Sequence, residues 1–296
     1  TGNSDDPTDI NNNVEVDDEV QDTISKSVSS LANAAFRKRE TKKLISEEEK
    51  EEQKEDQKKV SGKIKNSNSK LISKVLENKL IGEDATSIVQ DVIQTKTQKE
   101  SSSILNDGKN IEIENPENGK NLTQPTINIP KDFFKEILNE DETLQTNINF
   151  RASNFDKNPY FYSDASENIT TSVLSFKLLN SDSNNEEEIR VYNVSKPLTF
   201  VIRGQFNISS LESLNSTIPG QRPVCRYWNE TSEKWDTDGC VTLNVTSNAV
   251  TCECNHLPDF AAAVEYVVHQ ANYLKVEDVK NITKLNTDNM MPLIFG

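Results

Sequence analysis

The residues most able to do chemistry lie close together in the last third of the chain. They are all four cysteines, Cys225, Cys240, Cys252 and Cys254, together with His256. Thiols can pair as disulfides or bind a metal, and an imidazole can accept a proton from a neighbouring hydroxyl. An even number of clustered cysteines favours two disulfides and an oxidising compartment.

The spacing of the cysteines limits how they can be used. Cys252 and Cys254 share one face of an expected strand, so each must reach back to Cys225 or Cys240, and two pairings stay open. Zinc is the competing interpretation. The Cys-x-Cys-x-His spacing lacks the two cysteines two to four residues apart that are typical of structural zinc sites. We therefore expect no metal and no other cofactor.

The wider pattern around these residues is distinctive. It is C-x-x-W, then W-x4-C, then C-x-C-N-H-L-x-x-F, with Trp228, Trp235 and Phe260 at the aromatic positions. Over residues 222–262 the pattern resembles the GPS motif (GPCR proteolysis site). That motif ends the GAIN domain (GPCR-autoproteolysis-inducing domain) of adhesion receptors and polycystin-type channels.

The resemblance implies which cysteines pair. The implied disulfides are Cys225–Cys252 and Cys240–Cys254, each closing a short loop and contributing about 3 kcal/mol in the chain-entropy model. We expect Trp228 and Trp235 to be structural residues that are buried against these disulfides.

The resemblance also implies a reaction within the chain. In the family, a threonine or serine after His-Leu attacks the leucine carbonyl while the histidine accepts its proton. His256 and Leu257 occupy these positions, but Pro258 follows them. Proline has no hydroxyl, and its nitrogen makes the Leu257–Pro258 bond a tertiary amide. Asp259 comes one residue too late to replace the nucleophile. We therefore predict an uncleaved domain that is not an enzyme, with His256 as a buried structural residue.

The residues ahead of the motif begin with a helical part. Apolar residues recur at spacings of three or four, which predicts amphipathic helices at 18–38, 70–80 and 84–94. We expect Gly82 to break the pattern and Asp84 to cap the following helix. The mixed charge run at 44–60 is typical of a solvated helix or a connection.

From residue 108 the pattern changes to short alternating runs separated by Asn, Ser, Gly and Pro, which predicts a β-sandwich. The expected strands are 110–114, 126–130, 143–151, 173–179, 189–194, 198–204, 241–245 and 250–254, with one or two helical turns in 131–140. We therefore expect an α+β fold. A helical subdomain (18–107) precedes a disulfide-stapled β-sandwich subdomain (108–268), the order found in GAIN domains.

Both ends of the chain are expected to lie outside this folded part. Residues 1–17 are acidic and Asn-rich, and we interpret them as a disordered lead-in. Residues 260–268 resemble the family's last strand, a tethered agonist in adhesion receptors. We interpret 269–296 as a polar juxtamembrane linker that ends where a transmembrane segment begins, although no run of about 18 apolar residues is present.

The composition limits the classes of molecule that the chain can bind. The net charge of −15 argues against nucleic acid and anionic membranes. Sequons for N-linked glycans, in numbers close to chance for this composition, lie at Asn121, Asn168, Asn193, Asn207, Asn215, Asn229, Asn244 and Asn281.

Our first hypothesis is a non-cleaving GAIN/GPS domain on the extracellular side of the cell membrane. It would belong to a signalling receptor or an ion channel, and the length of the stretch after the motif favours the polycystin type by resemblance. Its partner would be the transmembrane part of its own chain, with an extracellular protein or glycan as a candidate ligand. The alternatives are a self-cleaving domain that uses His256 and a secreted binding sandwich.

Overall fold

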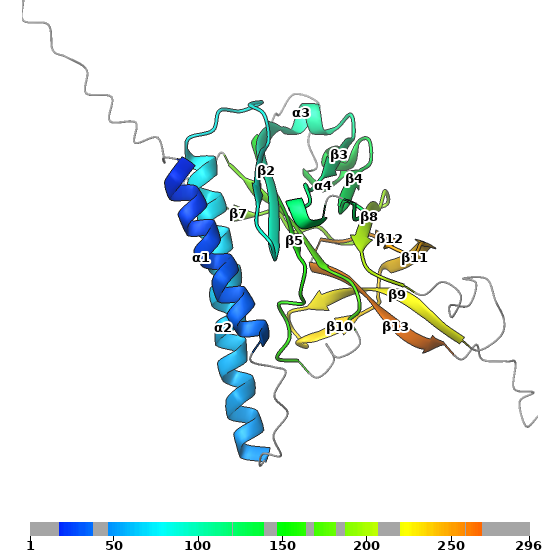
Figure 1. The fold of residues 1–296 in the computed structure, drawn as a ribbon. Coiled ribbons are helices and arrows are strands. Elements are labelled where there is room, and N and C mark those ends of the chain that lie inside the picture. Colours follow the sequence, from blue (N-terminus) through cyan, green and yellow to red (C-terminus); the bar gives the residue numbers. More distant parts are fainter. Residues whose placement is uncertain are drawn as a thin grey trace, which may run out of the picture.

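The structure is a computed structural model that describes residues 18–37, 47–119, 121–138, 147–163, 169–181, 187–206, 220–257 and 259–267. The expected lead-in (1–17) and linker (269–296) lie outside these residues, and so does Pro258. The fold has three layers: a pair of helices, a large sheet and a small sheet (Figure 1).

Two long helices form the first layer. Helix α1 (Asp18–Arg37) lies alongside α2 (Glu47–Glu77), as Figure 1 shows. The predicted periodicity is present, because Val28 and Ala32 are buried on α1 and Ile64 is buried on α2. The described part of the charge run (47–60) and the predicted helix at 70–80, as far as residue 77, belong to the single helix α2. After it the chain turns at Gly82, whose φ of +79° suits glycine.

The prediction of a helix at 84–94 is wrong. This stretch contains β1 (Thr86–Val89) and the start of β2 (Ile93–Ser101), which pair antiparallel as a hairpin. Ile88, Val89, Val92 and Ile93 are β-branched, which favours strand over helix. The sheet therefore begins at Thr86, inside the range that we expected to be helical.

The large sheet forms the middle layer. Its order is β1-β2-β5-β6-β13-β9-β10, and β7 pairs with β6. The further strands are β5 (Asn147–Phe155), β6 (Val173–Asn180), β7 (Glu187–Glu188), β9 (Gly220–Asn229), β10 (Lys234–Asp236) and β13 (Asp259–Val267). The last strand of the described chain, β13, thus lies inside the sheet, between β6 and β9.

The small sheet forms the third layer, in the order β11-β12-β8-β4-β3. Its strands are β3 (Lys109–Glu112), β4 (Thr126–Ile129), β8 (Leu198–Arg203), β11 (Cys240–Val245) and β12 (Ala249–Cys254). Short helices α3 (Ser102–Leu105), η2 (Glu117–Gly119) and α4 (Phe133–Leu138) lie in the connections. The predicted strand at 189–194 is wrong, because these residues have no regular structure.

Each face of the large sheet covers its own core. The first core lies between the two sheets and includes Phe150, Phe176, Phe200 and Phe260. The second core lies between the large sheet and the helices and joins Val28 and Ile64 to residues of the sheet. The α+β fold that we expected, with helices first and a disulfide-stapled pair of sheets after them, is confirmed. The helices lie on the face of the large sheet that points away from the small sheet.

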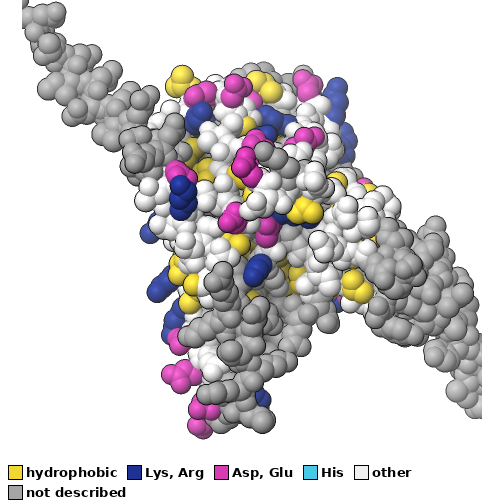
Figure 2. Space-filling model, in the orientation of Figure 1, with side chains coloured by type: hydrophobic (Ala, Val, Ile, Leu, Met, Phe, Trp, Pro, Cys, Tyr) yellow, Lys and Arg dark blue, Asp and Glu magenta, His cyan; other side chains and the backbone are white. Residues whose placement is uncertain are grey.

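The surface carries mixed charge. On the face shown in Figure 2, Lys and Arg side chains are interspersed with Asp and Glu side chains, and they do not gather into one patch. None of the helices in the described ranges is long and apolar enough to cross a membrane.

Candidate functional site: the disulfide-stapled strands and the His256 cleft

The two disulfides fasten different parts of the sandwich. Cys225–Cys252 joins β9 of the large sheet to β12 of the small sheet, with α carbons 5.8 Å apart. Cys240–Cys254 joins two directly opposite residues of β11 and β12. This is the pairing that the resemblance implied. One bridge therefore holds the sheets together, and the other holds the edge of the small sheet.

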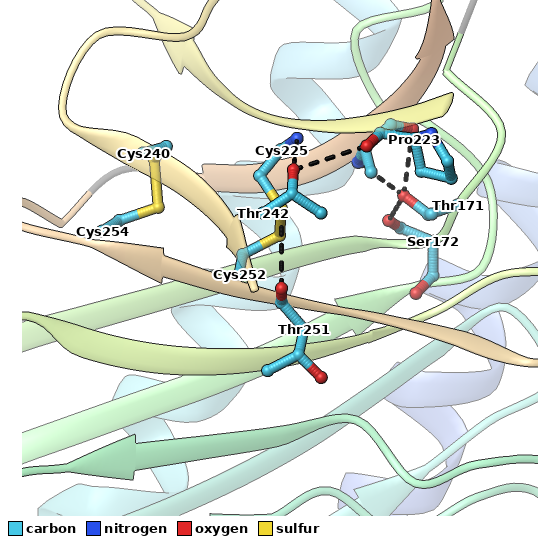
Figure 3. The surroundings of a disulfide bond; sticks show 10 residues. Thr171, Ser172, Pro223, Cys225, Cys240, Thr242, Thr251, Cys252 and Cys254 are labelled. Atoms are coloured by element: carbon cyan, nitrogen blue, oxygen red, sulfur yellow. Dashed lines mark hydrogen bonds between the residues drawn. A yellow bond between two sulfur atoms is a disulfide. The ribbon is translucent and has the colours of Figure 1, made fainter. Parts of the chain in front are cut away.

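A threonine strengthens the join beside the inter-sheet disulfide (Figure 3). The backbone N–H of Cys225 donates to the Thr242 hydroxyl at 2.9 Å, and that hydroxyl donates to the Pro223 carbonyl at 3.4 Å. Strand β11 is thus fixed to β9 by a side chain as well as to β12 by its backbone.

The expectation that the tryptophans pack against the disulfides is wrong. Both are buried, but Trp228 and Trp235 lie opposite each other on β9 and β10 in the second core, under the helices. The Tyr160 ring stacks on Trp228 with centroids 3.9 Å apart. Cys225 and Trp228 are three residues apart in one strand, and an odd spacing puts two side chains on opposite faces. The sequence therefore contained the signal that separates the two residues.

Phe260 lies in the first core as an aromatic structural residue. Its ring packs on Phe200 of β8 with centroids 4.1 Å apart. Its neighbours alternate between the cores, because Ala261 lies in the second core and Ala262 in the first. The first half of β13, up to Ala263, is therefore buried on both faces.

His256 follows β12 and is only 9% exposed. Its ring meets the Tyr227 ring edge-on with centroids 4.3 Å apart. Neither ring nitrogen has a hydrogen-bond partner among the described residues. Burial lowers the pKa of His256, and the opposing effect of Asp236 and Asp238 is smaller. The neutral form is therefore favoured, and its one unprotonated ring nitrogen, without a partner among the described residues, can accept a proton.

Gly239 makes room for the histidine turn. Its φ is +75°, and a Cβ there would lie 2.3 Å from Asn255 Oδ1 and 3.3 Å from His256 Cε1. The Asn255 N–H donates to the Gly239 carbonyl at 3.0 Å. A side chain at this position would displace the residues just before position 258, where the family motif has its cut.

The segment 189–194 braces the same turn. The Leu257 N–H donates to the Val191 carbonyl at 3.3 Å, and the Val194 N–H donates to the Asn255 carbonyl at 3.0 Å. These two bonds hold the backbone on either side of His256. The role of this segment is therefore to position the turn.

An open cleft of about 670 Å³ lies over these residues. His256, Leu257 and Asp259 line it, together with Tyr192 and Arg190 on the bracing segment. Residues on both sides of position 258 thus line the cleft, although Asp259 itself is only 5% exposed. We find no cluster of three or more His, Cys, Asp or Glu side chains placed to hold a metal within the described ranges.

Asp259 was considered only as a poor nucleophile, and its structural role was missed. It is 5% exposed, and its carboxylate accepts a hydrogen bond from the Tyr160 hydroxyl and lies 3.2 Å from Lys65 Nζ. Burial alone would raise its pKa, but Lys65, Ser175 and Tyr160 together hold the pKa below its ordinary value. The partners come from α2, from the loop after β5 and from β6, a combination for which the sequence holds no local signal.

Four of the sequon asparagines lie in the described residues and four lie outside them. Asn121, Asn193 and Asn244 are exposed, and Asn229 is half-buried. Its Oδ1 accepts hydrogen bonds from the backbone N–H groups of Thr231 and Ser232. Asn168, Asn207, Asn215 and Asn281 lie outside the described residues.

The inter-sheet disulfide, the braced histidine turn and the central last strand define a GPS-bearing sandwich. The chain belongs to the GPS family: the family model described as GAIN subdomain B matches residues 88–264, more than half of the chain. The resemblance seen in residues 222–262 is thereby confirmed, and the match also covers the strands from β2 to the first part of β13.

Two curated proteins show the same relationship at lower coverage. Latrophilin-like protein 1 of Caenorhabditis elegans is 27% identical over 161 residues, which is 52% of this chain and 15% of that protein. Adhesion G-protein coupled receptor G7 of Mus musculus is 29% identical over 96 residues, which is 32% of this chain and 11% of that protein. The chain thus corresponds to a small part of each relative.

A solved structure was also found. The full extracellular region of zebrafish Gpr126/Adgrg6 matches with a TM-score of 0.43 and 16% identity, over 81% of this chain and 31% of that one.

Proposed function

We propose that this chain is the extracellular, membrane-proximal GAIN/GPS domain of a larger adhesion-type receptor, and that it does not cut itself. By name, one curated relative is an adhesion receptor and another is latrophilin-like. The two disulfides suit an oxidising compartment. A polycystin-type channel is the alternative parent, and the partner in either case is the transmembrane part of the same chain.

The observation that carries the non-cleaving proposal is the residue at position 258. The motif is complete on both sides of it, with His256 and Leu257 before it and Phe260 after it. Pro258 supplies no hydroxyl to attack the Leu257 carbonyl. Because the bond is a tertiary amide, it also lacks the N–H of an ordinary peptide bond.

The proposed role is that of a spacer that clamps its own last strand. Strand β13 pairs with β9 from Phe260 to Val267 and meets β6 at Asp259 and Phe260. Phe260 and the following alanines are fully buried. Without a cut, β13 can leave the sheet only if the sandwich itself opens. The clamp therefore requires an intact chain at position 258.

The test compares the native chain with Pro258→Thr. Each is secreted, deglycosylated, run on a denaturing reducing gel and weighed intact. We expect a single full-length species for the native chain. We expect Pro258→Thr to yield two fragments with a break after Leu257, because His256 is neutral, faces the cleft and has ring nitrogens without partners among the described residues.

A matched control separates the role of the hydroxyl at position 258 from the role of His256 as the base. The double variant Pro258→Thr with His256→Gln should stay intact, because the hydroxyl would have no base beside it. Two fragments from the native chain itself would overturn the non-cleaving proposal. An intact Pro258→Thr chain would show that more than the nucleophile has been lost.

A further inference from the structure

The first residue of β13 is tied to the helical layer by a small polar cluster, which we call the latch: Lys65 of α2, Tyr160 of the loop after β5, and Asp259. Lys65 Nζ lies 3.2 Å from the Asp259 carboxylate and also donates to the Tyr160 hydroxyl. The Tyr160 hydroxyl in turn donates to Asp259. Three segments that are far apart in the sequence therefore meet next to position 258.

The surroundings of the latch make these contacts strong. The Asp259 side chain is 5% exposed and that of Lys65 is 25% exposed, so the pair is largely shielded from water. The Tyr160 ring lies against Trp228 and under the Lys65 ammonium, which is 4.4 Å from the ring centroid. Charge pairs in such places depend on both partners, because a buried carboxylate without a cation is costly.

The other polar contacts of α2 with the sheet reach β5 and the turn between β9 and β10, where Lys58 pairs with Glu233. Asn68 Nδ2 donates to the Ser153 hydroxyl at 3.2 Å, and Arg151 donates to the Ser69 hydroxyl at 3.0 Å. Both contacts end on β5. Among these polar contacts of α2, the Lys65–Asp259 pair is the one that reaches β13, the strand that the proposed clamp holds.

We propose that Lys65 couples the helical layer to the last strand, so that moving α2 away from the sheet loosens the start of β13. This inference rests on the proposed function, because it names the regulation of the clamp. The coupling is reciprocal, since any free energy that α2 gives to β13 is also given by β13 to α2. A ligand or a force that acts on the helices is thereby felt at Asp259.

Hydrogen exchange measured by mass spectrometry tests the coupling in the full-length chain. Lys65→Met keeps the apolar stem and removes the cation, and it should speed exchange at Phe260–Ala263 by about tenfold or more, because the buried carboxylate loses its ion-pair partner and keeps only the hydrogen bonds of Tyr160 and Ser175 and the weaker influence of Lys177. Exchange in β4 and β8 should stay unchanged. Lys63→Met is the matched control, because Lys63 is an exposed lysine of the same helix and should alter neither region.

A second variant keeps the inference falsifiable if Lys65→Met fails to fold. Asp259→Asn preserves the shape of the side chain and removes the charge. By reciprocity it should speed exchange of the α2 amides around Ile64. When Lys65→Met is added to Asp259→Asn, the further rise in the exchange rate of β13 should be smaller than the rise that Lys65→Met causes in the native chain. Unchanged exchange in β13 after Lys65→Met, or an equal rise in β4 and β8, would overturn the latch.

The two proposals fail separately. Cleavage of the native chain would remove the non-cleaving proposal, yet Asp259 would still begin β13, and its exchange would still report on Lys65. Conversely, a chain that stays intact but shows no effect of Lys65→Met keeps the proposed function and loses only the latch.

Discussion

Cys225 of β9 and Cys252 of β12 are the covalent join between the two sheets of the sandwich. The loop that they close spans 27 residues, while the loop closed by Cys240 and Cys254 spans 14. The first join has to keep two layers together, and the second has to keep only one strand at the edge of a sheet. The loss of either disulfide should therefore weaken the fold, but in different places.

Replacing both Cys225 and Cys252 with alanine should lower the free energy of unfolding by about 3.5 kcal/mol in the chain-entropy model. The matched pair, Cys240→Ala with Cys254→Ala, should cost about 3 kcal/mol, because its loop is shorter. Urea denaturation followed by tryptophan fluorescence measures both. An unchanged midpoint for the first pair would contradict the structural importance of the inter-sheet disulfide.

Trp228→Ala should destabilise the chain by about 3–5 kcal/mol, since it removes a large buried ring from the second core. The loss should loosen α1 and α2 more than the small sheet, because Trp228 packs under the helices. Hydrogen exchange of α2 peptides measures this. Phe200→Ala is the control. It removes one large ring from the first core and should speed exchange in the small sheet instead. The same response from both variants would count against two separate cores.

Gly239→Ala should destabilise the chain by about 1–3 kcal/mol, because the φ of +75° is unfavourable for alanine and the added Cβ would lie 2.3 Å from Asn255 Oδ1. Gly62→Ala offers a control of opposite sign. Nothing lies within 4 Å of a Cβ at Gly62 of α2, so it should gain about 0.5–1 kcal/mol. Thermal unfolding measures the stability of both variants. A Gly239→Ala chain as stable as the native chain would contradict the close packing of the histidine turn.

The stability of the chain should fall as pH drops below about 6.5, in part because of His256. Burial lowers the pKa of His256 in the folded state, so the unfolded chain takes up a proton first as pH falls. The contribution of neutral His256 to the free energy of unfolding is fully present above the ordinary pKa of histidine. It is lost as pH falls through the lower pKa that His256 has in the folded chain.

His256→Gln removes this titrating group and provides the comparison. The difference in unfolding free energy between the native chain and His256→Gln should change between pH 7.5 and pH 5 and be flat above that range. His269 is present in both proteins, so its contribution cancels in the difference. Parallel curves for the two proteins at all pH values would show that the pKa of His256 is not lowered.

The sequence predicted most of the sandwich and its family, because alternation and cysteine spacing are local signals. The sequence-based prediction was wrong where a local pattern was compatible with two kinds of structure. Residues 84–94 fit a helical period, but their β-branched residues pair within a hairpin. The segment 189–194 alternates like a strand, yet its backbone bonds brace the histidine turn. The meeting of Lys65 with Asp259 depends on how the layers stack, which no local pattern contains.

The central place of β13 also sets how the domain should respond to mechanical load. The hydrogen bonds of an antiparallel ladder run perpendicular to the strands, and those between β13 and β9 extend from Phe260 to Val267. A pull along the axis of β13 loads these bonds in shear, so that they share the load and must break together. A pull across the strand would open them one after another. The same strand is therefore stiff in one direction and easily unzipped in another.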